Sequence, residues 1–430
     1  MAASKNSTIP RIMSGFLGLP LRHQPWPPSM AVALHLDPAQ LVEEEKTPQY
    51  SPRRFFPTRL GQTLNGRYQV VTKLGYGSSS TVWLARDLYR WRWFQERYVA
   101  IKINATRHSS AKKLAKDELA VLGHIAWANP RHEGWHFVRK LVDSFVVDGE
   151  REKHQCLVFD PLREPLWLYC RRFTGAVIPP QILKIIVQMV LQGLDYLHTE
   201  CHVIHADLKP DNVMVKVEDP SILERDARDE HGHPLPQKHI HGRVIYLSRN
   251  NYGQPSVATG VVQITDFDLS VTGDVPQTGC IQAEIYRAPE AVLDAGYGYS
   301  ADIWSLGVML WDLLEGTKLF EYASRDQPTS EYDDQTHLAH ITALLGPAPS
   351  DLLAAGRRTS KFYTPDGNLK NPKLIPADFS FENTLTHVSG EGKRRFIDFV
   401  RKMIAWRPED RMTARELLKD PWLHKDFPQG

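Results

Sequence analysis

The run from His205 to Asn212 constrains this chain more than any other stretch. It reads His-Ala-Asp-Leu-Lys-Pro-Asp-Asn, and we expect a loop there because Pro210 cannot continue a helix. Within six residues the run presents the Asp207 carboxylate, the Lys209 ammonium and the Asn212 amide. A carboxylate can orient a hydroxyl and accept its proton, a cation can neutralise a transferring phosphoryl group, and an amide oxygen can hold a metal. The run therefore predicts a site for phosphoryl transfer.

The composition is that of an ordinary globular protein, with 42% hydrophobic and 24% charged residues in a chain of 430. This length predicts one large or two ordinary domains. The formal net charge of +2 gives no support to a nucleic-acid binder, which would usually carry a strongly basic face. The four cysteines are widely spaced without a C-x-x-C pair, so we expect a reducing compartment, the cytoplasm and/or the nucleus. Because no apolar run reaches about 18 residues, no membrane span is expected.

Residues 1–50 form a polar leader interrupted by prolines, and we predict that this leader is disordered. Its first 36 residues contain no acidic residue and carry Lys5, Arg11 and Arg22, a composition also compatible with a mitochondrial transit peptide. The disordered tail is the favoured interpretation, because the prolines break any long amphipathic helix.

A β-rich run from Tyr68 to Leu74 leads into a turn of small residues and a second β-rich run, which predicts two strands joined by a hairpin. Gly75 and Gly77 would let the backbone approach phosphates closely, with N–H groups pointing at them. An ordinary hairpin turn without a ligand is the alternative.

Lys102 is embedded in an apolar strand predicted over residues 98–103, where a lysine is costly unless it meets an opposite charge. The helix predicted over residues 109–125 supplies Glu118 within its apolar stripe, and we assign this residue as the partner. Asp117 is the rival, but it lies off that stripe, toward solvent.

Strands predicted over residues 137–147 and 155–159 complete a small antiparallel sheet. If the chain then passes through a hinge, the carbonyl of Asp160 and the N–H of Leu162 would face adenine. From residue 181 the apolar positions follow a helical period, which predicts an amphipathic helix of about 18 residues that delivers the chain to the opening loop.

After Asn212 a strand over residues 213–217 is predicted to pair with residues 261–265, directly before Asp266. The roughly 40 residues between these strands far exceed an ordinary hairpin loop and predict an insertion. Four histidines in it, His231, His233, His239 and His241, raise the possibility of a metal site. A solvated insertion is favoured, since no thiol and no fixed ligand spacing accompany them.

The order of these motifs resembles that of eukaryotic-type protein kinases, from the glycine-rich turn to Ala288-Pro289-Glu290 and a late Arg411 as the partner of Glu290. The resemblance covers residues 64–424. It implies an α+β fold of two lobes, a small antiparallel β N-lobe over 64–159 and a mainly α-helical C-lobe over 163–424 with the insertion at 218–260. In a buried helix predicted over 300–311, Asp302 could hold the backbone of the opening loop.

A closer resemblance rests on segments 65–71, 73–77, 81–85, 190–198 and 297–305. These segments resemble the SR-protein-specific serine/threonine kinases of the CMGC group. The resemblance implies ATP and Mg²⁺ as cofactors, with Asp207, Lys209, Lys102 and Glu118 as catalytic residues and Asn212 and Asp266 as metal ligands. The nucleotide-binding residues that the resemblance implies are Leu74, Gly75, Tyr76, Gly77, Ser80, Val82, Ala100 and Lys102. The resemblance also implies a monomer that phosphorylates serine or threonine of proteins, such as Arg/Ser-rich splicing or RNA-binding proteins, with no direct nucleic acid or membrane partner. Acidic residues could dock such a basic substrate: Glu331, Asp333 and Asp334.

Three positions depart from the kinase pattern. Ala206 stands where most kinases have the arginine that binds an activation-loop phosphate, so we expect activity without that phosphorylation. Asp268 replaces the glycine after Asp266-Phe267, and Ala283 replaces a threonine that usually bridges the catalytic aspartate and lysine. These departures motivate the alternative of a pseudokinase scaffold that binds nucleotide or partners without efficient turnover. A kinase for small molecules is a third hypothesis.

Overall fold

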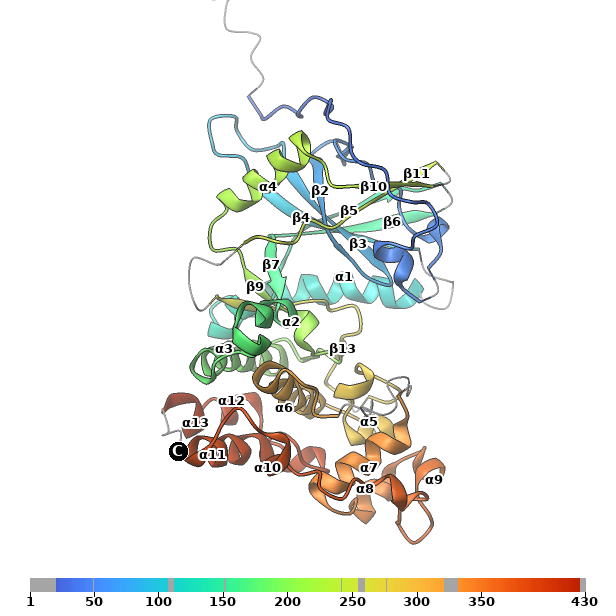
Figure 1. Ribbon diagram of the computed structural model, residues 1–430, viewed down its shortest axis with the longest axis vertical. Helices are drawn as coiled ribbons and strands as arrows, with labels where there is room; N and C mark the ends of the chain where they lie inside the picture. The colour runs from blue at the N-terminus through green and yellow to red at the C-terminus, as the bar shows by residue number, and fades with distance from the viewer. Residues whose placement is uncertain are drawn as a thin grey trace, which may run out of the picture. The chain divides into compact units, whose positions relative to one another are not determined.

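The computed structural model describes residues 21–48, 50–106, 112–150, 152–240, 242–253, 260–275, 277–320 and 332–425. The chain divides into two compact units. The first, which we call the sheet unit, comprises residues 1–106, 145–156 and 221–249. The second, the helical unit, comprises residues 107–144, 157–220 and 250–430. Figure 1 labels the helices and strands of both units.

The sheet unit is built on a six-stranded sheet with the strand order β1-β2-β3-β4-β6-β5. Strands β1 to β4 pair antiparallel with their neighbours in sequence, which confirms the predicted hairpin and the strand that carries Lys102. Apolar side chains of the central strands, such as Val70, Leu84 and Ile101, are fully buried. The bounds are β1 Thr63–Leu64, β2 Tyr68–Tyr76, β3 Ser80–Asp87, β4 Tyr98–Asn104, β5 Leu141–Asp148 and β6 Lys153–Phe159.

The predicted insertion has regular structure of its own. Its residues 221–249 belong to the sheet unit and form helix α4 (Ser221–Gly232) and a hairpin of β10 (Gln237–Ile240) and β11 (Arg243–Tyr246). Helix α4 packs against β2 and buries its apolar face (Figure 1). Among the described residues no three His, Cys, Asp or Glu side chains gather as metal ligands, and His241 lies outside the described residues.

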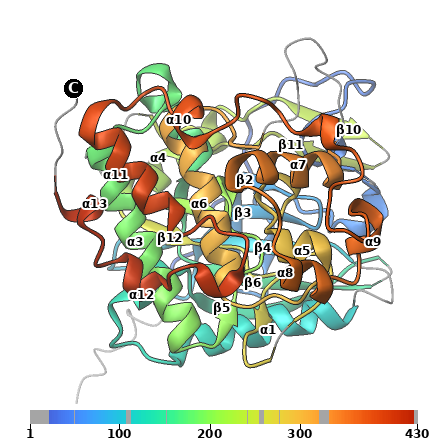
Figure 2. The ribbon, with the colours of Figure 1, turned by 90° about the horizontal axis from the view of Figure 1, so that it is seen from below.

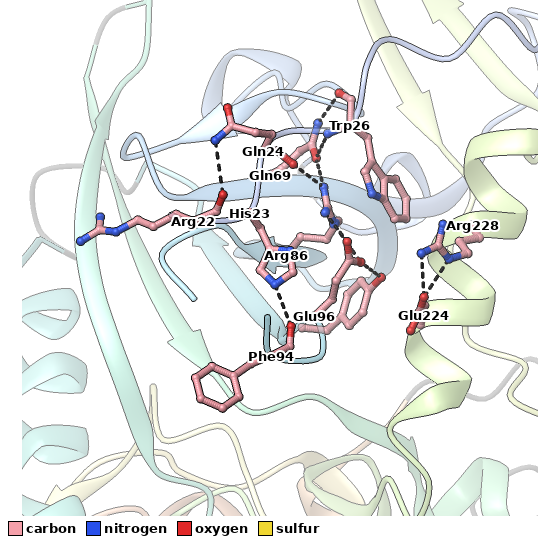
Figure 3. Close-up of polar contacts among 11 residues, drawn as sticks. Arg22, His23, Gln24, Trp26, Gln69, Arg86, Phe94, Glu96, Glu224 and Arg228 are labelled. Carbon is pink, nitrogen blue, oxygen red and sulfur yellow. Dashed lines mark hydrogen bonds and ion pairs between the residues drawn. The ribbon is translucent and has the colours of Figure 1, made fainter. Parts of the chain in front are cut away.

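The leader also differs from its prediction. The backbone of Trp26 exchanges two hydrogen bonds with the side chain of Gln69 on β2, at 2.8 and 2.9 Å. The guanidinium groups of Arg86 and Arg228 lie 4.3 and 5.3 Å from the Trp26 ring (Figure 3). A disordered leader is therefore wrong for residues 21–48, because contacts with distant β2, β3 and α4 outweigh a local composition typical of disorder. Residues 1–20 lie outside the described residues.

The helical unit is organised around two long helices, α3 (Pro180–Thr199) and α6 (Ser300–Glu315), which pack against each other. Both were predicted from their apolar patterns, and α6 is buried nearly all round. Helices α12 (Ala414–Leu417) and α13 (Pro421–His424) also contact α3 (Figure 2). Within the part of the chain that the structure describes, no helix is long and apolar enough to cross a bilayer.

Two small sheets of the helical unit frame the predicted loop. Strand β9 (Val213–Lys216) pairs with β12 (Val262–Ile264), as predicted, and also with β7 (Leu162–Pro165). Strand β8 (Val203–Ile204) pairs with β13 (Val271–Thr272). The remaining helices are α1 Lys112–Trp127, α2 Leu166–Tyr169, α5 Pro289–Leu293, α7 Asp334–Leu345, α8 Ser350–Ala355, α9 Thr359–Phe362, α10 Phe381–Thr384 and α11 Gly390–Arg401.

Candidate active site

The predicted loop brings three polar side chains into one hydrogen-bonded cluster between β8 and β9. Lys209 Nζ lies 2.7 Å from Asp207 Oδ2. Asn212 Nδ2 donates to the same carboxylate oxygen at 2.9 Å and to the Asp207 carbonyl at 2.8 Å. Because the amide donates through Nδ2, its Oδ1 oxygen is left as an acceptor, the kind of atom that a hard divalent metal prefers. The cation and the amide thus both contact the carboxylate directly.

Asp302 at the start of α6 holds the backbone of this loop. Its carboxylate accepts from the backbone N–H of His205 at 2.8 Å and of Ala206 at 2.9 Å, and His198 Nε2 lies 2.9 Å from Oδ2. Burial by itself would raise the pKa of the Asp302 carboxyl, but the hydrogen bond from His198 and the donation from His205 outweigh it and hold that pKa below its ordinary value. The predicted role of Asp302 as the anchor of the loop backbone is therefore confirmed.

His205 joins the loop to the strand that precedes Asp266. Its Nε2 atom contacts the Thr265 carbonyl at 2.9 Å, and its Nδ1 atom accepts from the Asp207 N–H at 3.2 Å. These partners assign the neutral tautomer with its proton on Nε2. Asp266 has a φ of 64°, a left-handed conformation that costs a non-glycine residue roughly 1–2 kcal/mol. The contacts of His205 hold the backbone on both sides of that strained position, since its ring also packs edge-on against Phe267.

Gln282 ties the segment that precedes Ala288 to the loop, a role that no local pattern in the sequence predicts. Its backbone N–H donates to the Ala206 carbonyl at 3.0 Å. Its side-chain Nε2 donates to the Ala301 carbonyl and to Ser305 Oγ, both at 2.8 Å, while Oε1 accepts from the Ala288 N–H at 2.9 Å. Every polar group of the Gln282 side chain is therefore used to hold this segment on the loop and on α6.

Glu290 and Arg411 form the predicted ion pair. The two side chains meet in a bidentate arrangement, with both N···O distances at 2.7 Å, and neither is exposed to solvent. Arg411 also donates to the carbonyls of Ser300 and Ala405, each at 3.0 Å. The pair fixes the end of the segment that begins near Asp266.

Two of the acidic residues proposed to dock a basic substrate, Asp333 and Asp334, have partners within the chain. Asp334 lies 2.6 Å from Arg358 and 3.3 Å from Arg287, so its charge is neutralised within the fold. Asp333 caps α7 by accepting from the Thr336 N–H at 2.9 Å. Glu331 lies outside the described residues. The docking hypothesis is therefore wrong for Asp334, because two arginines of its own chain already occupy its carboxylate.

The predicted phosphate-binding hairpin lies at the end of β2 and the start of β3. The Gly77 N–H donates to the Ser80 carbonyl at 2.9 Å and closes the turn. Neither Gly75 nor Gly77 has a positive φ, so conformational freedom is not what requires glycine at these positions. A Cβ atom added at Gly75 would meet nothing within 4 Å, and one at Gly77 only Ser80 Oγ at 3.8 Å. Glycine here leaves the backbone open to a close approach, as phosphate binding requires.

The register of the sheet places the other candidate nucleotide residues beside this hairpin. Val82 of β3 pairs with Gly75 of β2 on one side and with Lys102 of β4 on the other. Ala100 lies two residues before Lys102 and pairs with Leu84. Together with Leu74, Tyr76 and Ser80, these residues occupy one end of the β2–β3–β4 sheet.

The remaining predicted site residues belong to the helical unit. Glu118 lies in α1 and is buried, whereas Lys102 lies in the sheet unit, so their ion pair stays a prediction. Asp160 is exposed, and Leu162 begins β7 opposite Lys216 of β9. The contacts of both with adenine also stay predictions.

Comparison with known proteins identifies the family. Residues 68–423 match the model of the protein kinase domain. The chain belongs to the protein kinase family. This membership and the names of the relatives confirm the predicted class of enzyme, a protein serine/threonine kinase. A serine/threonine protein kinase of Aspergillus fumigatus is 36% identical over 406 residues, which cover 94% of this chain and 96% of that protein.

Other relatives support the predicted likeness to SR-protein kinases. A serine/threonine-protein kinase SRPK of Physarum polycephalum is 30% identical over 400 residues, which cover 89% of this chain and 91% of that protein. SRSF protein kinase 3 of Sus scrofa is 25% identical over 525 residues, with coverages of 89% and 90%. The crystal structure of another kinase domain matches with a TM-score of 0.63 at 22% identity, covering 86% of this chain and 99% of that one, and confirms the predicted fold.

Proposed function

We propose that this kinase transfers the γ-phosphate of ATP to serine or threonine residues of protein substrates and that Mg²⁺ supports the transfer. The observation that carries the proposal is the direct contact of Asp207 with Lys209 and Asn212. Bound Mg²⁺ would neutralise charge on the phosphates, and the Asn212 and Asp266 side chains would hold it. The open backbone at Gly75 and the free acceptor oxygen of Asn212 fit these two groups.

Each residue of the loop has a task that follows from its chemistry. Asp207 would orient the substrate hydroxyl and accept its proton, because its carboxylate is fixed by two donors. Lys209, at 2.7 Å from that carboxylate, would place a positive charge where the phosphoryl group passes. Lys102 would bind the α- and β-phosphates, with Glu118 as its partner. Catalysis of this kind rests on positioning and electrostatics, without a covalent intermediate on the protein.

The pseudokinase alternative rests on Ala283 and Asp268. The threonine that Ala283 replaces would bridge the aspartate and the lysine of the loop, yet Lys209 reaches Asp207 here without a bridge. This contact favours turnover over a scaffold function. The backbone hydrogen bond from Gln282 to Ala206 likewise supports activity without activation-loop phosphorylation, since it joins the segment to the loop where an arginine–phosphate contact would otherwise act.

For the substrate we propose serine in Arg/Ser-rich protein segments. The support is the resemblance of segments such as 190–198 and 297–305 to SR-protein kinases, together with relatives whose names refer to SRPK and SRSF proteins. A basic peptide without serine or threonine serves as the control for binding without transfer.

The test is transfer of radiolabelled phosphate from ATP to an Arg/Ser peptide in Mg²⁺ buffer. Asp207→Asn should reduce the signal by at least about 100-fold, because it removes the group that orients the hydroxyl. Asp211→Asn is the matched control, an exposed aspartate of the same loop, and should retain activity. EDTA should abolish transfer and excess Mg²⁺ should restore it. Equal signals from the wild type and Asp207→Asn would refute the proposal.

A further inference from the structure

Lys73 of β2 is a buried lysine whose partners come from two distant parts of the chain. Its side chain is fully buried. Its Nζ atom hydrogen bonds to Glu44 of the leader, lies 3.3 Å from Glu43 Oε2, and donates to the Tyr246 carbonyl of β11 at 3.1 Å. A buried ammonium is tolerated only with such compensation, so the leader and the insertion are both needed to hold β2 as it stands.

The leader turn that supplies these acids is itself held by the insertion. We call Glu43, Glu44 and Glu45, together with Lys73 and Lys238, the acidic clasp. Lys238 of β10 is equally buried and contacts both carboxylate oxygens of Glu45, at 2.8 and 2.9 Å. These contacts lie within the sheet unit and join residues about 30 to 200 positions apart in sequence.

The backbone of the clasp is strained at Glu43. Its φ of 52° is left-handed and costs a non-glycine residue roughly 1–2 kcal/mol. The Glu43 carboxylate accepts from the Ser248 N–H at 3.0 Å and from its Oγ at 2.5 Å, and these bonds hold the strained turn in place. A strained conformation persists only where its surroundings over-determine it, which marks this turn as more than a chance surface contact.

The clasp contacts β2 directly before the glycine-rich hairpin begins. Lys73 lies two residues before Gly75, and the pairing of β2 with β3 shifts register between these two residues. The Lys73 carbonyl accepts from the Arg249 N–H of the insertion at 2.8 Å, so its backbone and its side chain are both fixed. The Tyr76 ring lies 5.4 Å from Lys73 Nζ. Burial raises the pKa of the Tyr76 hydroxyl, and the negative charges of Glu43 and Glu44 raise it further. The acids of the clasp therefore lie close enough to the hairpin to act on one of its side chains.

We propose that Glu43, Glu44 and Lys73 are positioning residues that set the affinity of the kinase for its nucleotide. The turn of the hairpin, residues 77–80, consists of glycine and serine residues, which do little to fix its backbone. Its position therefore depends on the strand that leads into it. A displacement of about 1 Å in such a phosphate-binding group is enough to weaken a reaction strongly. This inference rests on the proposed use of the hairpin for nucleotide phosphates and assigns the leader and the insertion a part in it.

Steady-state kinetics on the full chain, with direct binding of a fluorescent ATP analogue, test the inference. Lys73→Met and Glu44→Gln should raise the Michaelis constant for ATP and the dissociation constant of the analogue by about tenfold. The Michaelis constant for an Arg/Ser peptide and kcat should stay within about twofold of wild type, since the peptide does not use the hairpin. Glu44→Gln keeps the shape of the side chain and serves if Lys73→Met does not fold.

Arg67→Met and Asp87→Asn are the matched controls, because they remove an ion pair of the same sheet unit that lies outside the clasp, at the end of β2 and β3 away from the hairpin. They should lower thermal stability without the rise in either ATP constant. Unchanged ATP constants in Lys73→Met and Glu44→Gln, or the same rise in the controls, would overturn the proposal. The binding measurement keeps it separate from the proposed function: a wild type that binds the analogue without turnover would refute only the latter.

Discussion

Replacement of Asp302 by alanine should disable the catalytic loop while the rest of the kinase stays folded. Ala206 has a φ of 64°, a conformation that costs roughly 1–2 kcal/mol in a residue with a Cβ atom. The two backbone hydrogen bonds to the Asp302 carboxylate offset this cost. Because the acceptor is charged, each bond contributes about 1.5–3 kcal/mol, so together they hold the loop with about 3–6 kcal/mol.

Asp302→Ala removes both acceptor oxygens and leaves the N–H groups of His205 and Ala206 without their partner. A loss of about 3 kcal/mol, the lower end of the range, corresponds to about a 100-fold fall in kcat/KM if the displaced loop is inactive. The fall in kcat/KM should be smaller for Asp302→Asn, because the single amide oxygen can still accept one of the two hydrogen bonds. Phosphate transfer to an Arg/Ser peptide measures the activity, and far-UV circular dichroism with a thermal scan confirms that each variant is folded.

Asp398→Ala provides the control, since this exposed aspartate on α11 has no contact with the loop. It should leave kcat/KM unchanged. The reasoning is refuted if folded Asp302→Ala retains kcat/KM within about threefold of wild type, since the loop would then keep its shape without the carboxylate.

Three further perturbations have defined outcomes. Glu290→Gln leaves Arg411 as a buried charge without its counter-ion and should lower the free energy of unfolding by about 3–5 kcal/mol, measured by urea denaturation; an unchanged midpoint would contradict this. Burial lowers the pKa of His337 to about 4, from an ordinary value of 6.5, so the unfolded chain binds this proton first as pH falls. Stability should therefore decrease from about pH 6.5 to about pH 4, and the decrease should be shallower in His337→Gln; parallel curves would exclude His337 as its source. Trp26→Ala removes the ring that the guanidinium groups of Arg86 and Arg228 contact and should speed tryptic cleavage after Arg22, whereas an equal cleavage rate would show that the ring does not hold the leader.

Local patterns predicted the helical unit because their information is contained in short stretches of chain. The apolar period from residue 181 gave α3, and the apolar run after Ser300 gave α6. The loop between β8 and β9 followed from Pro210 and its polar neighbours. Asp302 was predicted as its anchor because it lies in the first turn of a buried helix, where a carboxylate needs donors.

Other parts of the site depend on geometry that residue type does not reveal. Gln282 is an unremarkable amide in the sequence, and its role follows from a backbone φ of 67° that aims its N–H at Ala206. The engagement of Asp334 by two arginines similarly joins residues 24 and 47 positions apart. A charged residue in a loop is an equally good candidate for docking or for an internal pair until those partners are located.

The packing of the leader and the insertion on β2 was not predicted, for a related reason. One signal for it was nevertheless present in the sequence. The acidic run at Glu43–Glu45 has the composition of a solvated surface. Yet Lys73 lies in a β-rich run between Thr72 and Leu74, and the argument that required a partner for Lys102 applies to it equally. A lysine buried in a strand requires an acidic partner, and the residue that pairs with Lys73 across β3 is Trp83. A lysine embedded in a β-rich run therefore predicts an acidic partner elsewhere in the chain. For Lys73 that partner lies in the acidic run Glu43–Glu45, which composition alone assigns to a disordered tail.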